Sequence, residues 1–261
     1  MTNKLLVGHA DKTEQLLHIN GGFLLLAEPD LCAAAQHKFP RAHVFDPLAH
    51  SFNPLKDMDY RGARDFAALL YGISPEGGNT LTVRNGRRAL TRLLLSNKPR
   101  LDKLLPIPLT EMHEGTLEAL ATINDLLLSP VLTNVLCKPT NFSFKPTRKI
   151  IAKLDRAKLG DFDALVLGTL LIGQFQGQVI VPDAFYLREF HTSLIRQNRL
   201  IAGLNSFAEV SKTLEQTLLG IKDKLIFRTT PQDAEKLIIY TRHVEPNILV
   251  RQTGAEYTPA E

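Results

Sequence analysis

The chain has 261 residues, of which 44% are hydrophobic and 22% charged, and its 31 basic and 27 acidic residues give a formal net charge of +4. This length can bury one large core or two smaller ones, and the composition argues against intrinsic disorder. The two cysteines, Cys32 and Cys137, lack metal-ligand spacing, which argues against a disulfide-stapled scaffold and a structural zinc domain. The mild basic excess permits contact with nucleic acid without requiring it.

No uncharged apolar run approaches the roughly 18 residues that would cross a bilayer. The longest, residues 164–175, contains two glycines and a glutamine. The N-terminal residues show no apolar signal-peptide core before charge returns at Asp11 and Lys12. We therefore expect a soluble, cytoplasmic protein with reduced cysteines and no membrane span.

Short apolar runs alternate with helical patterns along most of the chain. Because parallel strands need long crossover connections, this alternation indicates βαβ units and a mainly parallel sheet. The runs predict strands at 4–7, 23–27, 43–45, 149–154, 178–181, 200–204 and 224–227. Between them, the pattern predicts helices at 12–19, 30–38, 60–71, 161–175, 185–196, 214–221 and 231–241.

The middle of the chain, about 81–136, is helical in pattern throughout. Helices are predicted at 87–95 and 114–128, separated by a proline-marked stretch at 98–110. We predict an α/β fold in which a mainly parallel sheet is flanked by helices and carries this block as a helical insertion. Residues 1–250 form one domain in this prediction, and 251–261 a disordered tail.

The first predicted strand runs directly into Gly8, Asp11, Lys12 and Thr13, where a P-loop protein has its phosphate-binding loop. In such a loop, glycines let backbone N–H groups curve around the phosphates, lysine contacts the β and γ oxygens, and threonine binds Mg²⁺. Here Gly8 and Lys12 are four positions apart rather than about six, and the second glycine is missing. Asp11 would also repel a triphosphate. The other interpretation is an ordinary strand-to-helix turn with Asp11 as its N-cap.

Three further polar residues follow predicted strands, at the sheet edge where α/β proteins bind ligands. Asp183 follows the strand at 178–181 and is placed either to hold Mg²⁺ or to cap the next helix. Ala184 stands where a water-activating glutamate is expected. Asn205 is placed as a sensor of the γ-phosphate and Arg228 as a ligand contact, although surface caps are the more frequent explanation for both.

Basic residues in the helical block share one helical face if the helix begins before Arg84. The face, formed by Arg84, Arg88 and Arg92, is either simply solvated or contacts a phosphate backbone. No aromatic residue is interleaved with it and the chain has no tryptophan, so base stacking is not supported. None of the eight histidines has metal-ligand spacing, and no GxSxG motif occurs.

Taken in order, these segments resemble the HerA/FtsK superfamily of P-loop motor ATPases, in particular its type IV secretion coupling-protein branch. The resemblance implies a RecA-like ATPase core that assembles as a ring and pumps DNA or protein. It also implies that Lys12 and Thr13 bind phosphate and Mg²⁺, that Asp183 is the second metal carboxylate, and that Arg228 acts between subunits. The matching segments are 44–47, 51–55, 151–154, 160–174, 179–183, 199–207 and 225–235.

This sequence departs from that family at two places that hydrolysis needs. The phosphate-binding loop is short, and Ala184 stands where the family has the glutamate that activates the attacking water. We therefore predict a degenerate, non-hydrolysing protein that acts as a structural or regulatory component of a DNA transfer or packaging machine. Its expected cofactors are ATP and Mg²⁺, bound weakly or not at all. Its expected partners are further copies or a paralogous ATPase, with non-specific DNA at Arg84, Arg88 and Arg92. The alternatives are an active, divergent ATPase of conjugation or phage DNA translocation and an unrelated α/β binding protein.

Overall fold

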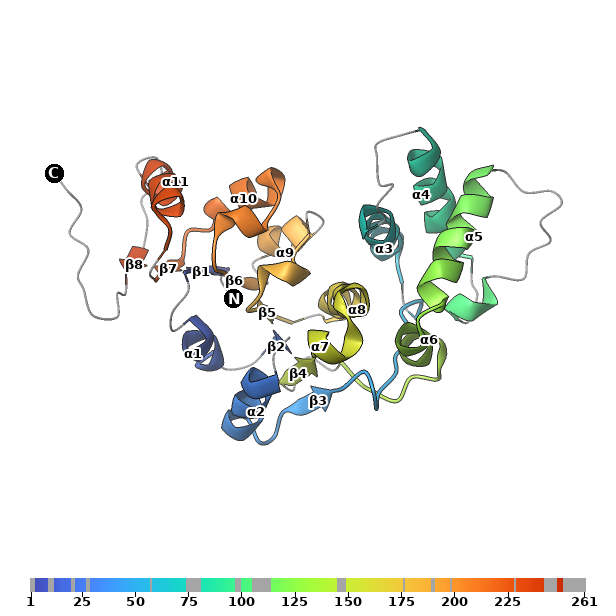
Figure 1. Cartoon of the computed structure of the whole chain (residues 1–261), viewed down its shortest axis with the longest axis horizontal. Helices are drawn as coiled ribbons and strands as arrows, with labels where there is room; N and C mark the ends of the chain where they lie inside the picture. The colour runs from blue at the N-terminus through green and yellow to red at the C-terminus, as the bar shows by residue number, and fades with distance from the viewer. Residues whose placement is uncertain are drawn as a thin grey trace. The chain divides into compact units, whose positions relative to one another are not determined.

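The structure is a computed structural model. In it, the chain forms two compact units (Figure 1). The sheet unit comprises Met1–Val44, Lys145–Lys153 and Phe175–Glu261, and the helical unit comprises Phe45–Phe144 and Leu154–Gln174. The predicted tail at 251–261 lies outside the described residues. The structure describes residues 3–8, 12–19, 22–26, 29–56, 58–73, 81–96, 100–104, 114–144, 149–175, 177–188, 191–197, 199–227, 229–241 and 248–250.

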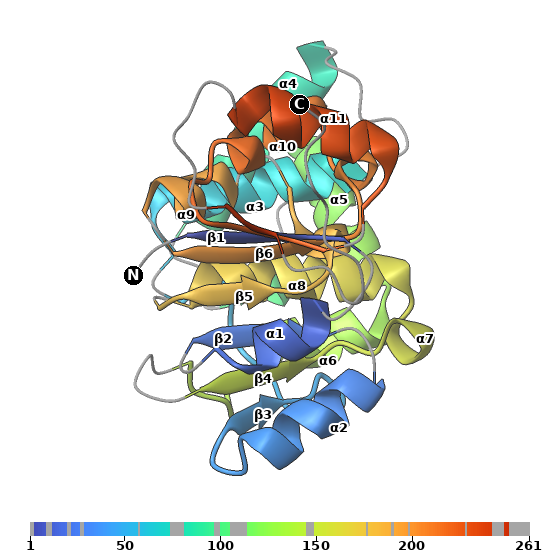
Figure 2. The ribbon, with the colours of Figure 1, turned by 90° about the vertical axis from the view of Figure 1, so that its left-hand side faces the viewer.

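The described part of the sheet unit is built on an eight-stranded sheet in the order β3-β4-β2-β5-β6-β1-β7-β8. Every pairing from β4 through to β8 is parallel, and Figure 2 shows β5, β6 and β1 side by side. The predicted mainly parallel sheet is therefore confirmed. The strands are β1 (Lys4–Val7), β2 (Phe23–Leu26), β3 (His43–Phe45), β4 (Ile150–Lys153), β5 (Val179–Val181), β6 (Leu200–Leu204), β7 (Lys224–Ile226) and β8 (Ile248–Val250).

Continuous apolar runs form the central strands because parallel strands are covered on both faces. All five residues of β6 and all three of β5 are buried, and Leu6, Ile180 and Ile201 belong to one core cluster. Short helices connect the strands and supply further apolar side chains such as Leu16 to that cluster. These helices are α1 (Lys12–Leu17), α2 (Pro29–Lys38), α9 (Thr192–Arg196), α10 (Lys212–Leu219) and α11 (Pro231–Thr241).

The predicted helix at 185–196 is wrong. The chain instead forms a single 3-10 turn, η3 (Ala184–Tyr186), and then the short helix α9. The guanidinium of Arg188 donates hydrogen bonds of 2.8 Å and 2.7 Å to the carbonyl oxygens of Phe185 and Leu187. Because a continuous helix would need those carbonyls for its own N–H groups, the side chain of Arg188 interrupts it.

In the helical unit, the described residues of the block at 81–136 are mostly helical, as predicted. Within it, α4 packs against α3 and α5, and α6 packs against α8. Ser129 caps α6 by accepting a hydrogen bond of 3.2 Å from the Leu132 N–H, and its hydroxyl donates to Asp163 Oδ2 at 2.5 Å. The helices of this unit are α3 (Tyr60–Ile73), α4 (Leu81–Leu94), α5 (Glu114–Leu127), α6 (Pro130–Cys137), α7 (Arg156–Leu159) and α8 (Asp161–Gln174).

Among the helices of the described ranges, no single one is both long enough and apolar enough to cross a bilayer. The pair Gly115–Leu127 and Pro130–Cys137 reaches the required length and composition only when its two members, bent by 103°, are taken together.

Gly86 lies where α3, α4 and α5 meet, and we expect any side chain there to destabilise the helical unit. A Cβ atom would lie 2.3 Å from Tyr71 Oη and 2.9 Å from Glu118 Oε2, and the Tyr71 ring is itself buried. Gly86→Ala is therefore expected to lower the free energy of unfolding by about 1–3 kcal/mol, although alanine favours helix. Chemical denaturation should show this loss.

Gly62→Ala is the matched control for this prediction. Gly62 is also helical, and a Cβ there would lie 3.3 Å from Asp59 Oδ1 and 3.4 Å from Met58 Cγ, both outside the short range seen at Gly86. We expect the control to change stability by no more than about 0.5 kcal/mol. Equal stabilities for the two variants would contradict the packing argument.

Candidate functional site

The carboxyl ends of β5, β6 and β1 meet at one edge of the sheet, and each is followed by a predicted site residue. The register pairs Val7 with Leu204 and Val181 with Ala202. Gly8 and Asn205 therefore follow directly paired positions, and the Gly8 N–H donates a hydrogen bond of 2.9 Å to the Leu204 carbonyl. The structure thus brings Gly8, Asn205 and Asp183 to the edge where ligand sites of α/β proteins form.

Gly8 ends β1 in a conformation that requires glycine. Its φ is +125°, which residues with a Cβ rarely adopt. The chain turns here towards α1, whose first two residues are Lys12 and Thr13. Residues 9–11, including Asp11, lie outside the described residues, as do the side chains of Lys12 and Thr13. The phosphate-binding roles of Lys12 and Thr13 stay predictions.

Asp183 follows β5 and caps the 3-10 turn that comes after it. Its Oδ1 accepts a hydrogen bond of 2.8 Å from the Phe185 N–H. Ala184 is only 1% exposed, and the turn that contains it packs against β6. The position after Asp183 is therefore part of the core, where a glutamate would have no access to an attacking water.

The loop that follows β6 is held by two carboxylates that the sequence analysis missed. Glu209 Oε2 accepts a hydrogen bond of 3.1 Å from the Asn205 N–H, and Asp233 Oδ1 accepts one of 3.3 Å from the Phe207 N–H. Asp233 is 2% exposed and lies in the first turn of α11, where its own N–H donates to Thr230 Oγ1 at 3.2 Å. For Asp233, the sequence contained one indication of a role at this site, because this residue lies in the segment 225–235 that resembles the coupling proteins. For Glu209 it contained none.

Asp183, Glu209 and Asp233 together form what we call the acidic edge. Each carboxylate accepts a backbone N–H from a segment that follows β5 or β6. Phosphate oxygens bind to RecA-like and other α/β proteins through backbone N–H groups of this kind. At three positions of this edge, a side chain of the protein itself therefore holds the backbone donor.

The remaining predicted site residues are not placed at this edge by the described structure. Arg228 lies outside the described residues, although the Phe227 N–H donates to the Val7 carbonyl at 2.7 Å and sets the end of β7 beside β1. Arg84, Arg88 and Arg92 belong to the helical unit. They lie on one helix, as expected, because α4 begins at Leu81. No group of three or more histidine, cysteine, aspartate or glutamate side chains within the described ranges is arranged to hold a metal ion.

Comparisons with known proteins find the same fold. No protein-family model matches the chain, and no curated protein matches its sequence. Among solved structures, the bacterial conjugative coupling protein TrwBdeltaN70 in its unbound monoclinic form has a TM-score of 0.57 and 14% identity, over 91% of this chain and 71% of that one. The plasmid coupling protein TrwB in complex with the non-hydrolysable GTP analogue GDPNP has a TM-score of 0.51 and 13% identity, over 92% and 68%.

VirB4 of Thermoanaerobacter pseudethanolicus is similar to the same degree. Its TM-score is 0.54 at 11% identity, and the match covers 93% of this chain and 82% of that one. At such low identities the likeness concerns the fold. The chain therefore has the RecA-like α/β fold that its resemblance to coupling proteins implied, with a parallel sheet flanked by helices.

Proposed function

We propose that the chain is a non-hydrolysing, RecA-like component of a DNA-transfer machine of the conjugation or type IV secretion type, with a structural or regulatory role. Its fold is that of a conjugative coupling protein and of VirB4, which supports the class of machine. The acidic edge is the observation that carries the non-hydrolysing role. In such a machine, further copies of the chain or a paralogous ATPase are the expected partners.

The acidic edge disfavours nucleotide for two physical reasons. First, Asp183 and Glu209 already hold backbone donors at this edge, so a phosphate bound to either donor would have to displace a carboxylate. Second, a carboxylate repels a phosphate by about 4 kcal/mol at 4 Å and an effective dielectric constant near 20. A net hydrogen bond contributes only about 1 kcal/mol in return. The few contacts that Lys12 and Thr13 could add do not offset several such charges.

One observation favours the alternative of an active, divergent ATPase: a protein of similar structure, TrwB, was solved with bound GDPNP. In this alternative Lys12 and Thr13 bind phosphate and Mg²⁺, and Asp183 supplies the second metal carboxylate. Asn205 then senses the γ-phosphate, and Arg228 acts on the nucleotide of a neighbouring subunit. A titration with ATP and Mg²⁺ separates the two proposals.

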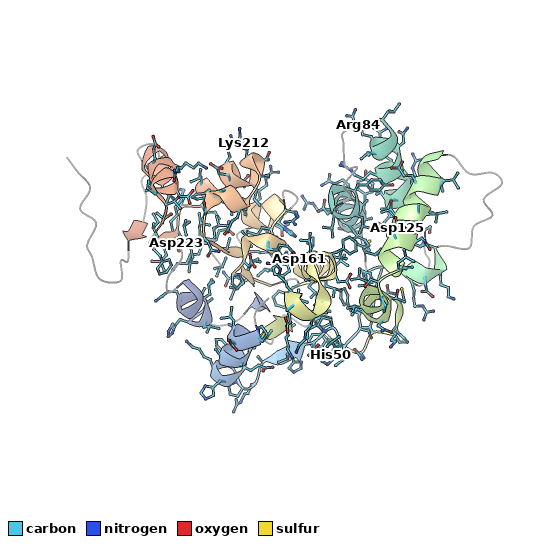
Figure 3. All side chains as sticks on the ribbon, viewed as in Figure 1. His50, Arg84, Asp125, Asp161, Lys212 and Asp223 are labelled. Atoms are coloured by element: carbon cyan, nitrogen blue, oxygen red, sulfur yellow. The ribbon has the colours of Figure 1, made fainter. Side chains whose placement is uncertain are left out.

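Isothermal titration of the full chain with ATP and Mg²⁺ is expected to show binding weaker than about 1 mM, or none. Glu209→Gln keeps an oxygen that can accept from the Asn205 N–H and removes one charge, so it is expected to bind nucleotide more tightly than the natural chain. The matched control is Asp223→Asn, because Asp223 directly precedes β7 and therefore lies at the amino ends of the strands, opposite the acidic edge. Asp223 is labelled in Figure 3. Sub-micromolar affinity for ATP that Lys12→Ala abolishes would overturn the proposed function.

A further inference from the structure

The exposed surface of α4 consists of arginine and asparagine alone along its central part. From residue 84 to 92, the buried or half-buried positions are glycine, alanine, leucine and threonine, which face α3 and α5. Figure 3 labels Arg84 on this helix. The exposed residues are Arg84, Asn85, Arg87, Arg88 and Arg92, and we call the four arginines the α4 basic face.

Within the described part of the chain, the α4 basic face has no acidic partner. None of its four side chains forms an ion pair or a side-chain hydrogen bond with another residue in the described ranges. The helix itself, LTVRNGRRALTRLL, contains no aspartate or glutamate. Like charges four residues apart on a helix repel by a few tenths of a kcal/mol, so the isolated face is slightly destabilising. A bound anion would remove this repulsion.

The helix α4 is a local centre of positive charge. The chain has 31 basic and 27 acidic residues, an excess of four, and α4 carries four arginines and no acid. The formal charges of all other residues therefore cancel. This is a local excess on one helix; other segments, such as residues 138–153 with five basic residues and no acidic one, are basic as well.

We infer that the α4 basic face binds the phosphate backbone of nucleic acid without reading its bases. Arg84, Arg88 and Arg92 follow one another at intervals of about 6 Å along the helix axis, which suits a target whose charge also repeats regularly. The arginine fork donates two parallel hydrogen bonds to a phosphate. An acidic protein is the poorer fit, because protein interfaces have an apolar centre, whereas the exposed leucines here, Leu81 and Leu95, lie only outside the stretch 84–92.

This inference rests on the proposed function in naming the partner of a DNA-linked machine, but its evidence lies in the helical unit alone. The double variant Arg88→Gln/Arg92→Gln tests it, since glutamine keeps a high helix propensity and removes two charges. Fluorescence anisotropy of a labelled DNA duplex of arbitrary sequence, over a series of NaCl concentrations, gives the slope of log affinity against log salt. We expect the double variant to make that negative slope shallower by about 1.8, or 0.9 per lost phosphate contact.

Two further variants keep the result interpretable. Arg88→Lys/Arg92→Lys retains the charge and is expected to keep a slope close to that of the natural chain. Lys212→Gln/Lys222→Gln removes the same charge from two exposed lysines of the sheet unit and should leave the slope unchanged. Lys212 is labelled in Figure 3. Circular dichroism of each variant verifies that its total helix content is unchanged.

Three outcomes would overturn the inference: affinity that does not depend on salt, an unchanged slope in Arg88→Gln/Arg92→Gln, or an equal loss in the sheet-unit control. In a competition experiment, polyglutamate is added to the bound duplex at an equal concentration of negative charge. If polyglutamate displaces the duplex, the α4 basic face binds an acidic protein instead. Failure of the proposed function can be distinguished from failure of this inference. A chain that binds ATP tightly and still shows the α4-dependent slope would lose the proposed function and keep this inference.

Discussion

ATP is expected to remain intact when it is incubated with the protein alone, with its oligomer, or with DNA. Phosphoryl transfer to water needs a metal clamp, a cation on the leaving phosphates and a group that orients the attacking water. Asp183 accepts the Phe185 N–H with Oδ1 and would have to serve the clamp with its remaining lone pairs, and Ala184 has no side chain that orients water. Loss of that group alone slows hydrolysis by about 10²-fold or more, or about 3 kcal/mol of barrier.

The burial of Ala184 sharpens this expectation. Because Ala184 is 1% exposed, Ala184→Glu would place a carboxylate in the core instead of beside an attacking water. We expect this variant to gain no phosphate release and to lose about 3 kcal/mol or more of unfolding free energy. Ala184→Ser is the control for size and should lose less. Phosphate release of about one per second that Asp183→Ala abolishes would contradict the expectation.

The strands were predictable because most of them are continuous apolar runs that the helices cover on both faces. The residues at 4–7 and 200–204 are of this kind, and both became neighbouring strands of the sheet. The short edge strand β8 (Ile248–Val250) was missed, because three apolar residues beside a polar tail carry no pattern. The start of α4 was also missed. Asn85 and Gly86 favour helix weakly, and packing against α3 and α5 decides the conformation there.

The candidate site was predictable only where a residue directly follows a strand. Asp183 and Asn205 were found in this way, since an apolar run that ends in a polar residue marks the carboxyl edge of a parallel sheet. Asp233 was not found, because it accepts its hydrogen bond from Phe207, 26 residues away. Glu209 is close in sequence to Asn205, but its contact depends on the 3-10 turn that the loop forms. Contacts of this kind arise from tertiary structure and leave no local pattern.

Mild acid is expected to destabilise the protein through His191. This side chain is 4% exposed, and its Nδ1 accepts a hydrogen bond of 3.0 Å from the Arg188 N–H. Burial, together with the nearby charge of Arg188, lowers the pKa of His191 from 6.5 to about 3. Between these two pH values the unfolded chain binds more protons than the folded one. The contribution of His191 to stability is therefore complete above pH 6.5 and is lost as the pH falls towards 3.

The size of this loss follows from linkage at about 1.4 kcal/mol per pH unit, so roughly 3 kcal/mol disappears between pH 6.5 and about pH 4.5. His191→Asn separates this effect from that of the carboxylates. Asparagine keeps an oxygen near the position of Nδ1 that can accept from the Arg188 N–H, and it does not titrate. Urea denaturation at a series of pH values should show the natural chain losing stability faster than the variant as the pH falls. If the difference between the two proteins stays constant over this range, His191 is not the group that makes the fold sensitive to acid.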